Sequence, residues 1–446
     1  MASVRKRGNS YQITVSNGRR PDGSQIVETA TYTPDPGMTK KQIEKALEAY
    51  AIDFERDVKS GKNIKGERMP FKQLAEQFLA DTSPEDPNII EPLEKTTWYN
   101  YKATIEHRII PRLGNIPIGQ VIPKTIKDYQ KALRKDGVRL DGKPGALSDG
   151  TIRKDCGIIS SILSYAVGEG YLPINPLIYA GRQNRRKQNK KEYEVNYLTI
   201  EQVKYLLWAM DHPIETKRKA HDRVDDTGKP YHVREYSSVW QLSLQWRAYF
   251  YLALFVGDRR GENVSFTWED INLKTGEVDI NTSTAYVNRE IIHKSTKTGR
   301  SRVPVIPQVV INILKQWKVE QKKICMELGS QWIGYRGAEF DKNYVFIQWN
   351  GKQMHPDSPY GKFKQLIKVY NEYAAKNANE MIPPQTTPHD LRHTAASILI
   401  SNNLDPRSVA GVLGHADPTT TLNIYSYFFR TKNQEAANIM SDVLFG

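Results

Sequence analysis

The first part of the chain alternates apolar and polar side chains in two short runs. Tyr11, Ile13 and Val15 alternate with polar neighbours, and residues 26–33 supply a second run after a stretch dense in turn formers. A period of two is typical of half-buried strands. Thr39 then precedes apolar residues at helical spacing, so we expect it to cap a helix. The pattern predicts a small α+β domain over residues 1–62.

The pattern changes to a helical period between residues 66 and 180. Phe71, Leu74 and Phe78 share one helical face. A second helix is expected to end at Pro111 and Gly114, since proline and glycine commonly mark such ends. Two further helices are predicted over residues 125–133 and 149–167. A small helical domain therefore follows the first domain.

Residues 181–196 form a basic linker that separates these regions from a third domain, over residues 197–446. The run GRQNRRKQNKK carries six basic residues and no acidic one, and such a run repels itself when it is free. Residues 212–237 are polar and lack apolar periodicity, so we interpret them as a surface insertion. The expected fold class is multidomain and mainly α, with small β-sheets.

The charge balance favours a polyanionic partner. The 64 Lys and Arg residues against 50 Asp and Glu give a formal net charge of +14, and the pI is near 9.4. Nucleic acid is the commonest such partner, although a merely soluble basic protein has the same balance. The basic residues expected to contact DNA are Arg5, Arg7, Arg19, Arg20, Arg108, Lys124, Arg153, Lys154, Arg185, Arg186 and Lys187.

Cysteine content and hydropathy narrow the cellular setting. The two cysteines lie far apart in sequence and have no metal-ligand spacing, which favours a reducing interior. The N-terminus lacks an apolar stretch behind its charges, and no segment approaches the roughly 20 apolar residues of a membrane span. A soluble protein of the cytoplasm, without membrane contact, is expected.

Four stretches of the third domain carry candidate chemistry. LFVGDRRGENVSFTWEDI places two arginines between helices, a position where arginine also pairs structurally with glutamate. In STKTGRSRVPV the turn signal places Lys297 at the tip of a β-hairpin, and Arg302 begins a further strand. HDLRH places His389 and Arg392 on one helical face. LGHADPTTTLNIY places Tyr425 ten residues after His415.

These residue types suit phosphodiester chemistry. Arg259 and Arg392 can clamp the non-bridging oxygens of a phosphate, because guanidinium groups match that geometry bidentately. A phenol with a pKa near 10 becomes a nucleophile only when a neighbour accepts its proton, and His389 and His415 are the candidates. Lys297 can deliver a proton to the leaving 5′-oxygen.

GDRRGE, STKTGRSRVPV, HDLRH and LGHADPTTTLNIY resemble, in order and spacing, the conserved boxes of the tyrosine recombinases of phages and conjugative transposons. The match covers residues 197–430. The resemblance implies that Arg259, Lys297, His389, Arg392 and His415 are catalytic and that Tyr425 is the nucleophile. It also makes residues 66–180 similar to the family's core-binding domain and residues 1–62 similar to its arm-binding domain. Tyr427 departs from the pattern, since many members have a histidine there.

The family acts on double-stranded DNA attachment sites as a homotetramer. It implies a 3′-phosphotyrosine intermediate, a Holliday junction, and integration and excision of a mobile element. It implies no cofactor, neither metal nor ATP, because the phosphotyrosine bond conserves the energy of the broken one. An excisionase or a DNA-bending accessory protein would set the direction of the reaction.

Three alternatives stay open beside this interpretation. A DNA resolvase or a type IB topoisomerase uses much the same residues, and a DNA-binding regulator that has lost catalysis keeps them without cutting. HDLRH also has histidines at i and i+4, as zinc proteases do, but Asp390 stands where that chemistry needs glutamate. The apolar residues of the tail 434–446 are expected to dock on a neighbouring protomer or on the tail's own domain.

Overall fold

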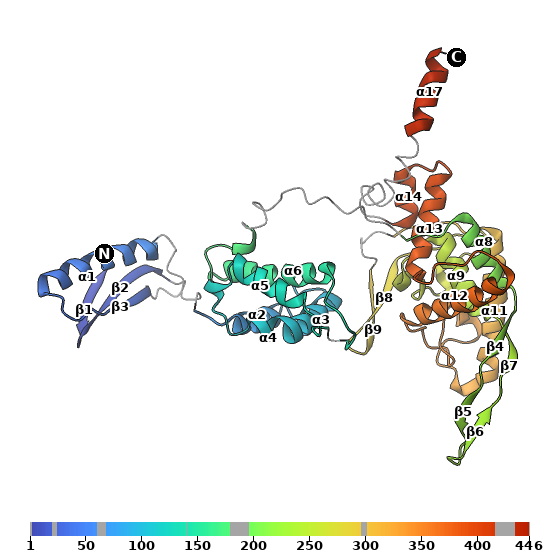
Figure 1. Cartoon of the computed structure of the whole chain (residues 1–446), viewed down its shortest axis with the longest axis horizontal. Helices are drawn as coiled ribbons and strands as arrows, with labels where there is room; N and C mark the ends of the chain where they lie inside the picture. Colours follow the sequence, from blue (N-terminus) through green and yellow to red (C-terminus); the bar gives the residue numbers. More distant parts are fainter. Residues whose placement is uncertain are drawn as a thin grey trace. The chain divides into compact units, whose positions relative to one another are not determined.

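The N-terminal region of the computed structural model is a three-stranded antiparallel sheet with one helix against it (Figure 1). Its elements are β1 (Ser3–Arg7), β2 (Ser10–Arg19), β3 (Gln25–Tyr32) and α1 (Lys40–Lys59). Ile13 and Val15 are buried, as their alternation predicts. The helix begins directly after Thr39, and the strand β1 adds an edge that the sequence analysis did not predict.

The structure describes residues 2–19, 25–59, 68–139, 141–178, 196–295, 301–414 and 433–445. The chain divides into two compact units, Met1–Asn189 and Lys190–Gly446. The expected basic linker lies almost entirely outside the described residues, so the four-part division drawn from the sequence stays a prediction.

The helical region of the first unit contains the expected helices around one apolar core. These are α2 (Phe71–Asp81), α3 (Lys95–Thr104), α4 (Ile110–Leu113), α5 (Pro123–Leu133) and α6 (Asp149–Gly168). A 3₁₀ turn at Ile118–Gln120 separates α4 from α5. Phe71 and Leu74 are fully buried, and residues from all these helices contribute to the core.

One predicted helix end is confirmed at Gly114 and is wrong at Pro111. The helical run that starts with α3 does not stop at Pro111 but continues through a π-helical turn, Ile105–Ile109, into α4, and it ends at Gly114. Proline lacks an N–H group and its ring clashes with the carbonyl four residues earlier. A π-helical turn is one way to carry a helix past such a site, because it relocates the hydrogen bonds.

The second unit is built around α9 (Leu244–Val256), whose residues from Ala248 to Leu254 are all buried. Packed around α9 are α8 (Ile200–Asp211), α11 (Gln308–Leu328), α12 (Ser358–Asn377), α13 (Pro388–Ser401) and α14 (Pro406–Leu413). One large apolar core joins most of these helices, and residues of α13 and α14 form a second, smaller one. Short helical turns occur at Arg260–Asn263 (α10), Trp268–Asp270, Gly329–Gln331 and Gly337–Lys342. The terminal helix is α17 (Asn433–Phe445).

In the described part of this unit, the strands form three two-stranded antiparallel ribbons. The insertion predicted over residues 212–237 is a β-ribbon in two tiers, whose lower tier extends from the helices in Figure 1. The first tier pairs β4 (Ile214–Arg218) with β7 (Tyr236–Trp240), and the second pairs β5 (His221–Val224) with β6 (Pro230–Val233). The third ribbon pairs β8 (Thr282–Val287) with β9 (Glu290–Ser295).

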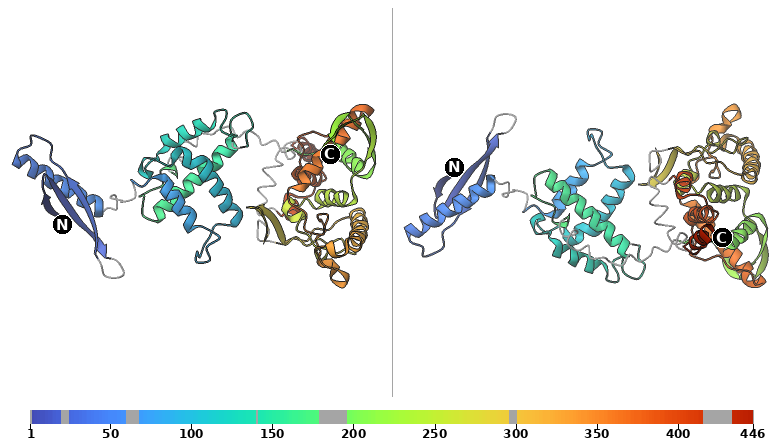
Figure 2. Two further views of the ribbon diagram at one scale, coloured as in Figure 1. Left: turned by 90° about the horizontal axis from the view of Figure 1, so that it is seen from below. Right: turned by 90° about the horizontal axis from the view of Figure 1, so that it is seen from above.

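The described part of the chain is thus mainly helical, with small antiparallel sheets, as the sequence predicts (Figure 2). Among the described helices, none is both long enough and apolar enough to cross a membrane.

Candidate active site

Arg259 is placed by a sharp change of direction between α9 and α10. Gly257 ends α9 in the left-handed conformation, with φ of 62°. A Cβ atom at this position would lie 2.5 Å from Leu413 Cδ2, so glycine is needed both for the turn and for the approach of α14. Arg259 then caps α10, and its backbone N–H donates to Glu262 Oε2 over 2.9 Å. Its side chain also pairs with Glu262, with 2.8 Å between Nη1 and Oε1.

Arg392 approaches the same turn from α13. Thr387 and Asp390 form a capping box at the start of this helix, and Pro388 occupies its first turn. Arg392 is only 3% exposed, and its Nη1 donates to the Gly257 carbonyl over 2.7 Å. Burial, together with the charge of Arg259, lowers the pKa of Arg392 to about 10. The two arginines therefore lie in one electrostatic cluster.

Arg302 and Glu262 complete this cluster, and the sequence analysis assigned neither a role in the site. Glu262 is fully buried, and Arg302 Nη2 donates to its Oε2 over 2.6 Å. Burial raises the pKa of Glu262, but the hydrogen bonds and charges of Arg302 and Arg259 outweigh it and leave the pKa below its ordinary value. Arg259 and Glu262 are three residues apart at the start of a helix. This spacing is the one sequence signal that Glu262 pairs with Arg259.

The described residues leave two buried guanidinium nitrogens without hydrogen-bond partners, Arg302 Nη1 and Arg392 Nη2. Buried polar groups are normally hydrogen-bonded, and guanidinium forks match phosphate oxygens. Arg302 Nη1 lies against Gly414, whereas Arg392 Nη2 is suited to bind an anion. The arrangement provides positive charge that is already desolvated, which strengthens its interaction with developing negative charge.

His389 lies beside Arg392 on α13. Burial, and then the charge of Arg392, lowers the pKa of His389, which keeps the imidazole neutral and able to accept a proton near neutral pH. Its ring meets that of His393 edge to face, with 4.9 Å between the centroids. Burial also lowers the pKa of His393 to about 4.

HDLRH shows no metal-site geometry among the described residues. Asp390, at the position where a zinc protease has glutamate, accepts hydrogen bonds from the backbone and hydroxyl of Thr387 at 2.7 and 2.9 Å. The described part of the chain contains no group of three or more potential ligands. Asp390 is the third residue of α13 and completes the capping box with Thr387.

Asp258 is a buried carboxyl group within the same turn. It is 6% exposed, and its Oδ2 has no partner among the described residues. Burial, reinforced by the charge of Glu262, raises the pKa of Asp258 to about 8, although Arg302 and Arg392 oppose the shift. Asp258 thus binds a proton under conditions where exposed carboxyl groups are ionised.

Three of the six predicted catalytic residues lie outside the described residues: Lys297, His415 and Tyr425. Tyr427 does as well. The described hairpin pairs β8 with β9 and turns at Asn288 and Arg289, which have positive φ values of 48° and 65°. The turn expected to carry Lys297, between β9 and Arg302, lies outside the described residues. Arg302 makes an isolated bridge to Ile280 in place of the expected strand.

The predicted DNA-binding residues occupy different environments. Six have described surroundings, and five of these are exposed: Arg5, Arg7, Lys124, Arg153 and Lys154. Arg108 differs, because its guanidinium pairs with the fully buried Asp155 through hydrogen bonds of 2.8 and 2.9 Å. The Arg108 side chain therefore pairs with a buried carboxylate inside the helical region and is not an exposed basic group. The Arg19 side chain lies outside the described residues, as do Arg20, Arg185, Arg186 and Lys187.

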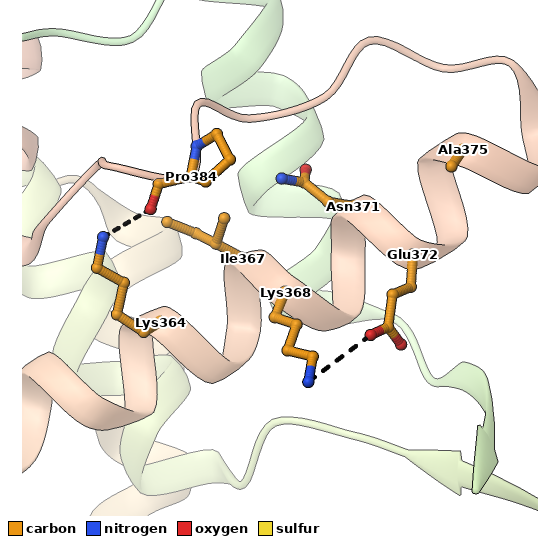
Figure 3. A pocket seen from close by; sticks show the side chains of 7 residues that line it. All are labelled: Lys364, Ile367, Lys368, Asn371, Glu372, Ala375 and Pro384. Atoms are coloured by element: carbon orange, nitrogen blue, oxygen red, sulfur yellow. Dashed lines mark hydrogen bonds and ion pairs between the residues drawn. The ribbon is translucent and has the colours of Figure 1, made fainter. Parts of the chain in front are cut away.

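A hollow of about 390 Å³ lies along α12, bordered by Pro384 (Figure 3). Lys364 donates to the Pro384 carbonyl over 2.6 Å, and Lys368 pairs with Glu372 at 4.0 Å. None of the residues lining the hollow belongs to the arginine cluster. The candidate site is therefore the cluster around the Gly257 turn and not this hollow.

Comparison with known proteins bears on the whole chain. Residues 233–429 match the phage integrase family, and residues 71–134 match the N-terminal SAM-like domain of phage integrases. The chain is 24% identical to the ICEBs1 integrase of Bacillus subtilis (strain 168), over 99% of this chain and 100% of that protein. It is 37% identical to the transposase from transposon Tn916 of Enterococcus faecalis, over 30% of this chain and 29% of that protein.

A solved structure has a similar fold. The Tn1549 transposon integrase, in complex with transposon right end DNA, superposes with a TM-score of 0.58, covering 85% of this chain and 100% of that chain. The sequence identity is 18%. The likeness at this identity concerns the fold alone.

Proposed function

Because the chain belongs to the phage integrase family of tyrosine recombinases, we propose that it is a site-specific DNA recombinase that integrates and excises a mobile element. The integrase and transposase relatives from mobile elements support this role. Double-stranded attachment sites are the proposed substrate, and the net charge of +14 suits that polyanion.

One observation carries the proposal: Arg392 hydrogen-bonds the Gly257 carbonyl, two residues before Arg259, so two arginines from distant helices converge. Their remaining N–H groups would hold the non-bridging oxygens of the scissile phosphate. Negative charge grows on these oxygens during attack, and donors aimed at developing charge accelerate the reaction.

The proposed reaction uses Tyr425 as the nucleophile. Its phenolic oxygen forms a bond to phosphorus while the bond from phosphorus to the 5′-oxygen breaks, which leaves a 3′-phosphotyrosine and a 5′-hydroxyl. The phenolic proton passes to His389 or His415, and Lys297 protonates the leaving oxygen. The phosphotyrosine retains the energy of the broken bond, so the step consumes no ATP. Attack by the 5′-hydroxyl of another strand reverses it.

Exchange of both strand pairs requires four cleavage events. We therefore infer that four protomers assemble on two attachment sites and pass through a Holliday junction. An accessory protein, such as an excisionase or a DNA-bending protein, would select between integration and excision. The exposed basic residues of the first unit are the proposed phosphate contacts away from the cleavage site.

The test uses attachment-site DNA from the flanks of the gene, nicked near the crossover point so that the 5′-hydroxyl fragment diffuses away. The unmodified protein should become covalently attached to the DNA and migrate slowly on a denaturing gel. Tyr425→Phe should bind without attachment, and Tyr427→Phe should still attach. If the unmodified protein binds the nicked DNA but never attaches, the chain is a DNA-binding regulator.

A further inference from the structure

Arg302 joins three parts of the second unit through one guanidinium group. Its backbone lies opposite Ile280, where the two residues form an isolated bridge. Its Nη2 donates to Glu262 Oε2 on α10 over 2.6 Å, and its Nε donates to the Val412 carbonyl on α14 over 3.0 Å. The side chain is 9% exposed, so these contacts are made away from solvent.

Arg259 makes a parallel pair of contacts. Its Nη1 donates to Glu262 Oε1 over 2.8 Å, and its Nη2 donates to the Gly414 carbonyl over 3.1 Å. Glu262 therefore lies between two arginines, one on each carboxylate oxygen. Each arginine also holds one carbonyl at the C-terminal end of α14.

The end of a helix is a place where such contacts matter. Its last four carbonyls have no partner within the helix, and together they carry a partial negative charge. The Arg302 guanidinium satisfies one of these carbonyls, that of Val412, and Arg259 binds the carbonyl of Gly414, the residue that caps α14. Because both groups share Glu262, the position of the helix end is coupled to the orientation of Arg259.

The Arg302 guanidinium lies close to the backbone of Gly414 at the end of α14. Gly414 ends α14 with φ of 70°, and a Cβ atom there would lie 2.6 Å from Arg302 Nη1. A glycine therefore permits the helix end to sit directly on the Arg302 guanidinium. The next residue in the chain is His415.

We propose that Arg302 is a positioning residue for the recombination site: it orients Arg259 through Glu262 and holds the end of α14 against the same carboxylate. The proposal rests on the proposed function of this site. Arg302 makes its described contacts with the protein, and Arg259 makes the contact with the scissile phosphate. Loss of Arg302 should therefore slow the chemical step while leaving DNA affinity largely unchanged.

The test compares Arg302→Gln, Arg302→Lys and Glu262→Gln with a matched control, Arg247→Gln. Arg247 pairs with Asp211 over 2.6 Å and lies at the other end of α9, about 15 Å from Gly257 along the helix. Each protein is assayed for single-turnover cleavage of the nicked DNA, for DNA affinity and for hydrogen exchange in the peptide 406–414. The last measurement requires no DNA cleavage.

Arg302→Gln should cleave up to about 100-fold more slowly at saturating protein, since small misplacement of a catalytic group costs that much. Its DNA affinity should stay within about threefold of the unmodified protein, and exchange over 406–414 should accelerate. Arg302→Lys keeps the charge but cannot contact both Glu262 and the Val412 carbonyl. Its cleavage rate should therefore lie between those of Arg302→Gln and the unmodified protein. Arg247→Gln should change neither cleavage nor exchange over 406–414.

The cleavage rate of the double variant Arg302→Gln, Glu262→Gln distinguishes a positioning role from general destabilisation. The two changes act on one network, so the double variant should cleave hardly more slowly than the worse single variant. Cleavage losses that multiply to within about twofold would overturn the proposal. A cleavage rate of Arg302→Lys equal to that of the unmodified protein would also overturn the proposal. This comparison decides the question even if Arg302→Gln does not fold. If the unmodified protein fails to cleave, the proposed function fails, while the exchange data still test the hold on α14.

Discussion

Arg392 Nη1 donates a hydrogen bond of 2.7 Å to the carbonyl of Gly257, although 135 residues separate them. The bond ties the start of α13 to the turn that presents Arg259. It uses one donor of the Arg392 guanidinium and leaves Nη2 without a partner among the described residues. One side of the guanidinium thus anchors it, and the other side is available for a substrate oxygen.

Replacement of Arg392 by lysine should abolish most cleavage. A lysine ammonium is a single point charge that cannot hold the Gly257 carbonyl and a phosphate oxygen in the same planar geometry. We expect the single-turnover rate on nicked attachment-site DNA to fall by about 10²- to 10³-fold, the usual cost of a lost transition-state donor. Arg407→Lys, on the exposed surface of α14, is the control. Equal rates for the two variants would contradict the proposed role.

Asp258→Asn should stabilise the protein at neutral and alkaline pH. The pKa of Asp258 is raised from 3.8 to about 8, so below pH 4 its carboxyl is protonated in both the folded and the unfolded states. As pH rises from 4 to 8, the unfolded state releases this proton first, and the folded state loses relative stability throughout that window. Asparagine removes the penalty, which is on the order of a few kcal/mol.

Thermal unfolding measured between pH 4 and pH 8 tests this expectation. The gain of Asp258→Asn over the unmodified protein should be largest at pH 8 and should vanish towards pH 4. Asp405→Asn is a control of opposite sign, because hydrogen bonds donated by Ser408 lower the pKa of Asp405 and its substitution should bring no gain at neutral pH. A gain from Asp258→Asn that is constant with pH would refute the account.

Arg108→Gln should destabilise the helical region of the first unit. Asp155 is fully buried and accepts two hydrogen bonds from Arg108 and one from Tyr129 at 3.2 Å. Removing the arginine leaves a buried carboxylate without its counter-ion, which typically costs about 3–5 kcal/mol. Hydrogen exchange of α3 and α6 in the full chain should accelerate accordingly.

The neighbouring exposed Arg153 provides the comparison for Arg108. Arg153→Gln should leave hydrogen exchange in α6 unchanged. If Arg153 contacts a phosphate, the variant should also bind DNA more weakly, and its DNA affinity should depend less on salt concentration. Unchanged exchange in Arg108→Gln would mean that the pair with Asp155 does not hold the helices together.

Deletion of residues 434–446 should weaken assembly on DNA. The end of α17 exposes Val443, Leu444 and Phe445 at 76%, 61% and 88%. Exposed apolar clusters of this kind often mark contact surfaces. Sedimentation of the protein on paired attachment sites should show fewer tetramers for the deletion and for Phe445→Asp. Unchanged assembly with lower thermal stability would instead mean that the tail packs on its own protomer.

Much of the local structure follows from the sequence because its causes are local. The helix predicted over residues 149–167 is α6, Asp149–Gly168, and the alternation of Ile13 and Val15 correctly predicts a half-buried strand. Helix caps, turns and apolar periods depend on neighbours within a few residues. Pro111 shows the limit, since a π-helical turn carries the helix past a residue that usually ends one.

Part of the candidate site could be predicted from the sequence, and part could not. The sequence motifs single out Arg259, His389 and Arg392, and the structure brings the two arginines together at the Gly257 turn. The catalytic roles of these residues, and of Lys297, His415 and Tyr425, stay predictions. The pairing of Arg302 with Glu262, and the use of Arg108 inside the helical region, were not foreseen.

The sequence by itself determined many of the helices and the strands around Ile13 and over residues 26–33, which residue types are available for phosphate chemistry, and which family the chain resembles. Only the tertiary structure decided which arginines are desolvated, which carboxylate each one faces, and that the end of α14 rests on two of them. The physical reason is that the preferences of helices and turns arise between residues close in the chain. The partner of a charged side chain depends instead on burial and on segments that folding brings together from distant positions.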